Sequence, residues 1–88
     1  MEVEYLKSFA NDLKRIQDPM LLKRIARVIQ EVKDARTPQE IRHVKKLEQE
    51  PNAFRIRVGD HRIGFYLTGG RIVLARIADR RDIYKVFP

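Results

Sequence analysis

The chain has 88 residues, which leaves length for a single domain over residues 1–88 with one small core. Hydrophobic residues make up 43% of it, and four glycines and four prolines are spread along it, which excludes a disordered or low-complexity chain. The absence of cysteine excludes disulfides and thiolate zinc sites, and two histidines alone do not form a usual metal site. We therefore expect neither a metal nor any other cofactor.

The charge is positive and uneven. The net charge is +7, and residues 53–88 carry eight basic and three acidic side chains, against eleven and nine in residues 1–52. Seven of the eight late basic residues are arginine, which binds phosphate through two parallel hydrogen bonds. This pattern predicts an anionic partner, most simply a nucleic acid, and leaves a charged, solvated surface as the alternative.

No apolar run is long enough to span a membrane, and the N-terminus lacks the pattern of a signal peptide. We therefore expect a cytoplasmic protein without a membrane partner.

The N-terminal third predicts a short strand and a first helix. Polar and apolar residues alternate over 2–5, as in a strand. Apolar residues then recur at steps of three and four, which predicts an amphipathic helix with Ser8 as a candidate cap. The apolar face of this helix consists of Leu6, Phe9, Ala10, Leu13 and Ile16.

A second helix begins at Asp18-Pro19, where aspartate can cap the free amides and proline suits the first helical position. Its predicted apolar face consists of Leu22, Ile25, Val28, Ile29 and Val32. The tight connection makes the two helices antiparallel neighbours.

The middle of the chain predicts short elements. Thr37-Pro38-Gln39-Glu40 has the residues of a capping box, which predicts a short turn of helix. Residues 43–47 can be extended, and Pro51-Asn52 predicts a turn.

Three strands follow as a meander. Residues 54–58 and 62–67 alternate between apolar and other side chains, with Gly59-Asp60 as the turn between them. After a second turn at Gly69-Gly70, the run 72–75 is apolar on both faces, which is typical of a central strand. If the apolar side chains of the meander face the helices, the opposite face gathers Arg55, Arg57, Arg62 and Tyr66.

These elements predict an α+β fold. A short N-terminal strand and two antiparallel helices are followed by a twisted, mainly antiparallel sheet, with the helices packed on one of its faces.

Two segments carry a resemblance to a known family. The sequence from Phe54 to Ile63 has an aromatic residue, two alternating arginines, a glycine turn and a further arginine, and Arg80 and Tyr84 follow the last strand. This combination resembles the RelE/ParE toxin family of type II toxin–antitoxin systems. The resemblance implies a single RelE-like toxin domain.

The resemblance also implies a function and partners. RelE-like members are endoribonucleases, or mRNA interferases, many of which cut messenger RNA in the ribosomal A site and so inhibit translation. ParE-like members inhibit DNA gyrase and lack the catalytic residues. Members of both kinds are held inactive by a cognate antitoxin protein.

By position, the resemblance implies Arg62, Arg80 and Tyr84 as catalytic residues, with Arg55 and Arg57 as RNA-binding residues of the sheet. Cleavage by the 2′-hydroxyl of the RNA requires alignment, removal of a proton, neutralisation of the phosphorane and protonation of the leaving 5′ oxygen. Fixed arginines suit the third task, but arginine is too weak an acid to transfer protons.

The proton-transfer residues stay open in the sequence. The family commonly has histidine where this chain has Asp79 and tyrosine where it has His61. Asp79 is either a general base or the partner of a neighbouring arginine, and His61 is either an acid or base or an exposed residue beside a turn. Lys45 and Lys46 either contact RNA phosphates, transfer protons or are solvated.

We predict from the sequence a metal-independent endoribonuclease acting on mRNA at the ribosome and regulated by an antitoxin. The alternatives are a ParE-like gyrase inhibitor and an RNA-binding domain without activity.

Overall fold

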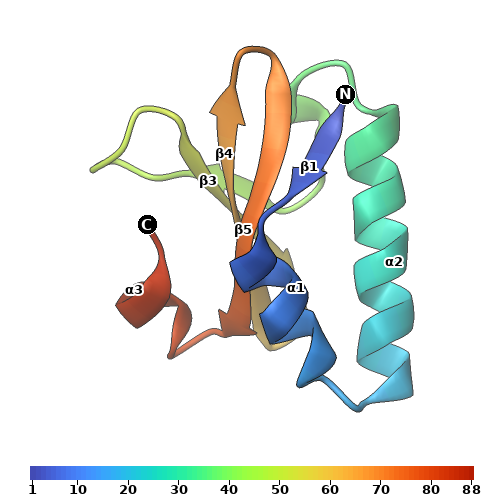
Figure 1. The fold of residues 1–88 in the computed structure, drawn as a ribbon. Helices are drawn as coiled ribbons and strands as arrows, with labels where there is room; N and C mark the ends of the chain where they lie inside the picture. Colours follow the sequence, from blue (N-terminus) through green and yellow to red (C-terminus); the bar gives the residue numbers. More distant parts are fainter.

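The computed structural model describes all 88 residues and has a five-stranded sheet with helices on both of its faces (Figure 1). The strand order across the sheet is β1-β5-β4-β3-β2. The strands are β1 (Val3–Tyr5), β2 (Val44–Lys46), β3 (Ala53–Val58), β4 (His61–Thr68) and β5 (Arg71–Asp79). The helices are α1 (Lys7–Lys14), α2 (Pro19–Asp34), the 3-10 turn η1 (Pro38–Glu40) and α3 (Ile83–Val86).

The pairing of the strands confirms the predicted α+β class and mainly antiparallel sheet. Only β1 runs parallel to its neighbour, with Val3 opposite Ile72 of β5. The pairs β2–β3, β3–β4 and β4–β5 are antiparallel. The apolar run 72–75 lies in an interior strand, although the middle strand of the sheet is β4 rather than β5.

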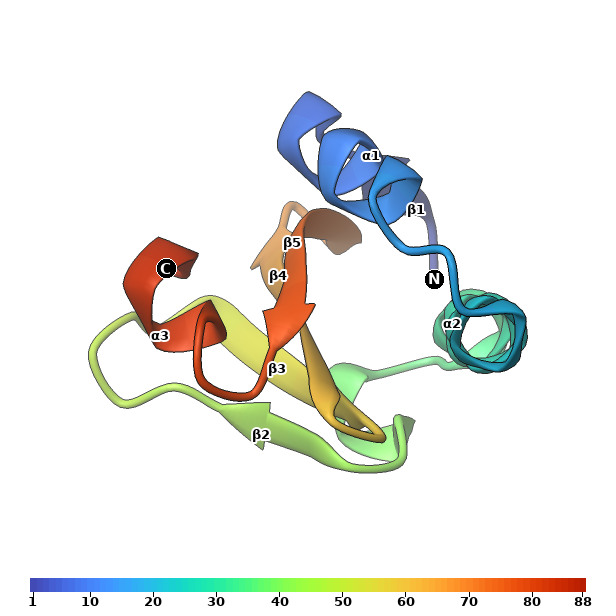
Figure 2. The same cartoon turned by 90° about the horizontal axis from the view of Figure 1, so that it is seen from below.

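Apolar side chains form a separate core on each face of the sheet. Helices α1 and α2 cover one face, where Phe9, Ile25 and Val32 pack with the apolar residues of β3 and β4. The other face carries the short helix α3, which Figure 2 shows on the opposite side of the strands from α2. There Ile83 and Phe87 are buried against the sheet.

A glycine lets α3 pack so closely. A Cβ atom at Gly64 would lie 2.5 Å from the ring of Phe87, so any larger residue would collide with it. Tyr66, two residues further along β4, has its ring 5.0 Å from that of Phe87. Gly64 and Tyr66 together form the surface of β4 on which Phe87 packs.

The structure tests three predictions about helix ends. Asp18 caps α2 as expected, since its Oδ1 accepts a hydrogen bond of 2.9 Å from the Met20 amide. Ser8 as a cap is wrong, because its hydroxyl donates to the carbonyl of Ala75 in β5 at 2.6 Å. The short turn of helix predicted at Thr37 is confirmed as the 3-10 turn η1, but the Thr37 side chain makes no cap hydrogen bond.

The predicted apolar face of α2 is confirmed except at its first position. Leu22 is 37% exposed, whereas Leu21 packs against the core together with the predicted Ile25, Val28, Ile29 and Val32. Leu21, Ile25, Val28 and Val32 follow one another at steps of four, three and four, so they form one stripe along the helix.

Asp12 of α1 is the one buried charged side chain. Its two oxygens accept hydrogen bonds of 2.7 and 3.1 Å from the Arg76 guanidinium, and Oδ2 also accepts from the Ile77 amide at 3.0 Å. The pair raises the pKa of Arg76, first through the hydrogen bond and then through the charge of Asp12. These contacts tie α1 to the part of β5 that extends beyond β1.

None of the helices combines the length and the apolar content needed to cross a membrane.

Candidate functional site

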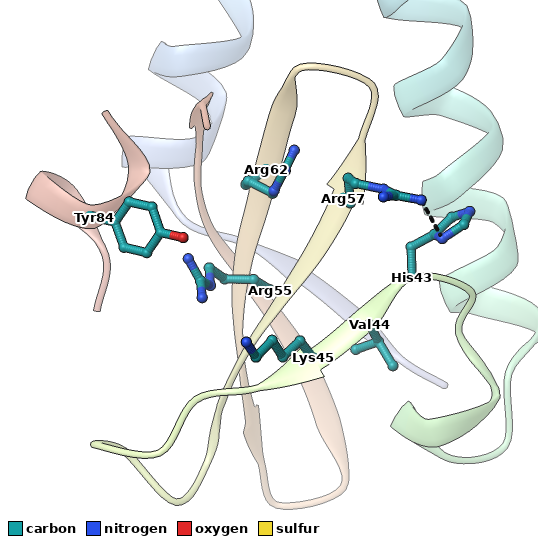
Figure 3. Close-up of a pocket in the computed structure, with 7 residues that line it drawn as sticks. All are labelled: His43, Val44, Lys45, Arg55, Arg57, Arg62 and Tyr84. Atoms are coloured by element: carbon teal, nitrogen blue, oxygen red, sulfur yellow. Dashed lines mark hydrogen bonds between the residues drawn. The ribbon is translucent and has the colours of Figure 1, made fainter. Parts of the chain in front are cut away.

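An open cavity of about 360 Å³ lies on the face of the sheet away from α1 and α2 (Figure 3). Its lining is mostly cationic and comes from β2, β3, β4 and α3, together with the residue before β2. The lining residues are His43, Val44, Lys45, Arg55, Arg57, Arg62 and Tyr84. The predicted gathering of arginines on this face is therefore confirmed.

Strand register brings like charges face to face. Arg57 of β3 lies directly opposite Arg62 of β4, and Lys45 of β2 lies opposite Arg55 of β3. Like charges in such cross-strand positions destabilise a sheet. None of these four side chains takes part in any of the three ion pairs of the structure, so no ion pair offsets the repulsion. The cavity is therefore suited to a bound anion.

Arg62 is held in position by the turn that precedes it. Its Nη1 donates to the carbonyl oxygens of Gly59 at 3.1 Å and His61 at 3.0 Å. These bonds use one end of the guanidinium to fix the side chain.

Tyr84 is presented to the cavity by α3. It is 70% exposed, although its helix neighbours Ile83 and Phe87 are buried. The guanidinium carbon of Arg55 lies 4.5 Å from the centre of the Tyr84 ring, which is a cation–π contact. Arg55 lowers the pKa of Tyr84, because it can donate a hydrogen bond to the phenolate oxygen and its charge stabilises the phenolate.

Arg80 lines an adjoining cavity of about 450 Å³, which has His43, Arg57 and Arg62 in common with the first. The Arg80 amide donates to the Asp60 carbonyl at 2.8 Å, which joins the end of β5 to the β3–β4 turn. The structure thus brings Arg80 beside the cluster, although Tyr84 lines only the first of the two cavities.

Three predicted residues lie elsewhere. Lys46 is exposed and lines neither cavity, since it alternates with Lys45 along β2. His61 and Asp79 are cross-strand partners and line a different cavity between α1 and α3. His61 has the same parity along β4 as Ile63, so it faces the helix side of the sheet.

Asp79 makes contacts that the sequence did not indicate. Its Oδ1 accepts hydrogen bonds from the amides of Asp82 at 2.8 Å and Arg81 at 2.9 Å, and these bonds lower its pKa. Asp79 forms no ion pair with an arginine, so its observed contacts are with the backbone of the turn before α3.

His43 is the site residue that the sequence analysis did not assign. It lines both cavities, and its Nδ1 lies 3.1 Å from Nη2 of Arg57. Alternation along β2 does not reach His43, because it precedes the strand and has a positive φ, so the sequence carried no local signal for its position. No three histidine, aspartate or glutamate side chains in the structure converge as a metal site would require.

The comparisons with known proteins agree with this arrangement. Residues 3–84 match the family described as the ParE toxin of the type II toxin–antitoxin system parDE. The chain is 35% identical to Toxin RelE3 of Methanocaldococcus jannaschii over 89 residues, which cover 100% of both proteins.

Solved structures give the same result. The RelB-RelE antitoxin-toxin complex from Methanococcus jannaschii matches with a TM-score of 0.81 and 33% identity, over 97% of this chain and 99% of that one. The RelE-RelB complex from Pyrococcus horikoshii OT3 matches with a TM-score of 0.73 over 90% and 93% of the two chains, and at 20% identity it shows the fold alone.

The sheet, its two helical faces and the sequence identity define a RelE-like domain. The chain belongs to the RelE/ParE toxin family of type II toxin–antitoxin systems.

Proposed function

We propose that this protein is the toxin of a RelBE-type system and that it cleaves messenger RNA in the ribosomal A site. The observation that supports this proposal is the uncompensated cationic cluster beside an exposed tyrosine. A cluster that repels itself in the free protein becomes favourable once a phosphate lies among its members.

The residues of the two cavities can each serve a different requirement of RNA cleavage. Arg57 and Arg62 stand opposite each other across two strands and can hold the phosphate between them. Their fixed charges would neutralise the phosphorane that forms when the 2′-hydroxyl attacks. Tyr84 offers an exposed ring on which a base can stack, and Arg80 supplies a further positive charge from the adjoining cavity.

The charge of the chain and the exposed side of α2 suit an antitoxin partner. The chain carries +7, and α2 exposes Met20 at 62% and Leu22 at 37%. An antitoxin segment with acidic and apolar side chains would complement both features. We expect this complex to persist at moderate salt, because screening weakens charge contacts but not the packing of apolar side chains. A complex that dissociates fully at moderate salt would contradict this expectation.

A ParE-like gyrase inhibitor is the second candidate, and the description of the matching family favours it. This candidate gives no role to the opposed arginines, so we place it second.

Primer extension on translating ribosomes tests the proposal. The wild-type protein should cut mRNA in the A site, and Arg62→Ala should cut it much more slowly. Arg36→Ala is the matched control, because Arg36 is exposed and lines neither cavity, and it should cut like the wild type. The absence of cleavage by the wild type, together with gyrase poisoning in a supercoiling assay, would overturn the proposal.

A further inference from the structure

We propose that His43 is the general base of the reaction, which takes the proton from the attacking 2′-hydroxyl. This inference rests on the proposed RNA cleavage. The cavity lined by Tyr84 and the opposed arginines has many positive charges and lacks a carboxylate, so something other than arginine must accept a proton there. Imidazole is the side chain whose protonation changes near neutral pH.

His43 lies where the cavities meet. It lines the two described above and a third, which runs between α2 and the β3–β4 turn. The charged and titratable residues that share these three cavities with it are Lys45, Arg55, Arg57, Arg62, Tyr84, Asp60, Arg80, Arg24, Arg27, Glu31 and Arg42. A phosphate drawn to these cations would therefore arrive next to the imidazole.

The backbone of His43 is strained. Its φ is +62°, and it is the one residue other than glycine with a positive φ. Its carbonyl oxygen accepts a hydrogen bond from the Arg57 amide at 3.2 Å, which holds the strained conformation against β3. Strain of this kind costs free energy and is found preferentially at functional sites.

The contact with Arg57 assigns the tautomer of the neutral His43 ring. A guanidinium has only donors, so Nδ1 of His43 accepts, and the proton of the neutral ring is assigned to Nε2 (Figure 3). When Arg57 turns to a bound phosphate, the lone pair of Nδ1 becomes free beside that phosphate. In the free protein Nδ1 is therefore held in its contact with Arg57 until the substrate displaces that partner.

Figure 3 shows His43 at one end of the cavity and Tyr84 at the other, with Arg55, Arg57 and Arg62 between them. An in-line displacement needs a base on one side of the phosphorus and an acid on the opposite side. The lowered pKa of Tyr84 makes its phenol a stronger acid than a free tyrosine. The arrangement supports a base at His43 and an acid at Tyr84.

Two proton transfers accompany the formation and cleavage of the bonds to phosphorus. The 2′-hydroxyl proton moves to Nδ1 of His43 while the 2′ oxygen forms a bond to phosphorus. The bond from phosphorus to the 5′ oxygen breaks, and that oxygen takes the phenol proton of Tyr84. The products are a 2′,3′-cyclic phosphate and a 5′-hydroxyl. Water then takes the proton from the imidazolium and returns one to the phenolate.

The test compares pH profiles of single-turnover cleavage on translating ribosomes. His43→Asn is the main variant, because asparagine tolerates a positive φ and can still accept from Arg57, but it cannot take up a proton. We expect a loss of about 100-fold at neutral pH. We also expect loss of the rise in rate with pH that the wild type shows as an imidazole deprotonates.

Two further variants keep the inference falsifiable. His43→Gly relieves the strained backbone and opens a space, so added imidazole should restore part of its activity. If His61→Asn removes the acid limb of the profile while His43→Asn retains it, His61 is the base and the inference is wrong. Wild-type rate and pH dependence in His43→Asn would also overturn it. The proposed function fails separately, if the wild type itself does not cleave.

Discussion

Two sets of arginines on the same sheet differ in their partners. Arg76 of β5 is bound by the buried carboxylate of Asp12, whereas Arg57 and Arg62 face each other and neither forms an ion pair. The paired arginine joins an edge of the sheet to a helix, and the unpaired ones line an open cavity. An ion pair with a buried carboxylate therefore distinguishes the arginine that stabilises the fold from the arginines that are available to bind an anion.

The largest expected effect is on the rate of RNA cleavage, and it tests Arg62 of the unpaired arginines. Arg62→Ala should lower the rate of RNA cleavage by about 10²–10³-fold, because one preorganised charge at the developing oxyanion is lost. The free energy of unfolding should change by less than about 1 kcal/mol, since the lost hydrogen bonds lie at a partly exposed turn. Single-turnover kinetics and urea unfolding on one preparation measure both. Unchanged activity per folded molecule would remove Arg62 from the site.

Loss of the partner of Arg76 should instead lower stability and leave cleavage unchanged. Asp12→Ala should lower the free energy of unfolding by about 3 kcal/mol, because it leaves the Arg76 guanidinium and the Ile77 amide without their acceptor. Cleavage per folded molecule should stay the same. Asp34→Ala on the exposed end of α2 is the control, and it should change stability by less than about 0.5 kcal/mol. Equal losses in the two variants would show that the buried pair has no special role.

A smaller effect tests how the sheet supports Tyr84. Gly64→Ala should lower the free energy of unfolding by about 2 kcal/mol, because the added methyl group collides with the Phe87 ring. It should also lower cleavage, since Phe87 anchors the helix that carries Tyr84. In a Phe87→Ala background the same change should cost much less, and a double-mutant cycle measures this difference. Additive losses would show that the two residues do not interact.

The smallest effect concerns the turn before α3. The pKa of Asp79 is lowered in the folded protein by the amides of Asp82 and Arg81, so ionised Asp79 stabilises the fold above the pKa of an unfolded aspartate, about 3.9. This stabilisation is lost as the pH falls through the lower, folded value. Asp79→Asn should therefore be less stable than the wild type near neutral pH, and the difference should shrink below about pH 4. Urea unfolding at several pH values measures it, and a difference independent of pH would contradict the assignment.

Alternation in the sequence predicted the arginine face, because the period of two along a strand is a local property that fixes which side chains share a face. The same parity argument separates Lys46 from Lys45 and places His61 with Ile63 on the helix side. The positions of these two residues on the sheet can therefore also be predicted from the sequence.

Other features depend on contacts far apart in the chain. The hydroxyl of Ser8 resembles a cap until β5 brings the carbonyl of Ala75 within reach. The positive φ of His43 depends on its contacts with Arg57, fourteen residues later. No periodicity within one segment contains such information, because the partner belongs to another element of the fold.

The place of α3 after the last strand has a consequence for synthesis. Tyr84 and its anchor Phe87 both follow β5 in the chain. Because a ribosome makes the chain from its N-terminus, the sheet and its arginines are synthesised before the tyrosine and the aromatic residue that holds it. A chain interrupted before α3 would therefore carry the arginines of the proposed site without its tyrosine.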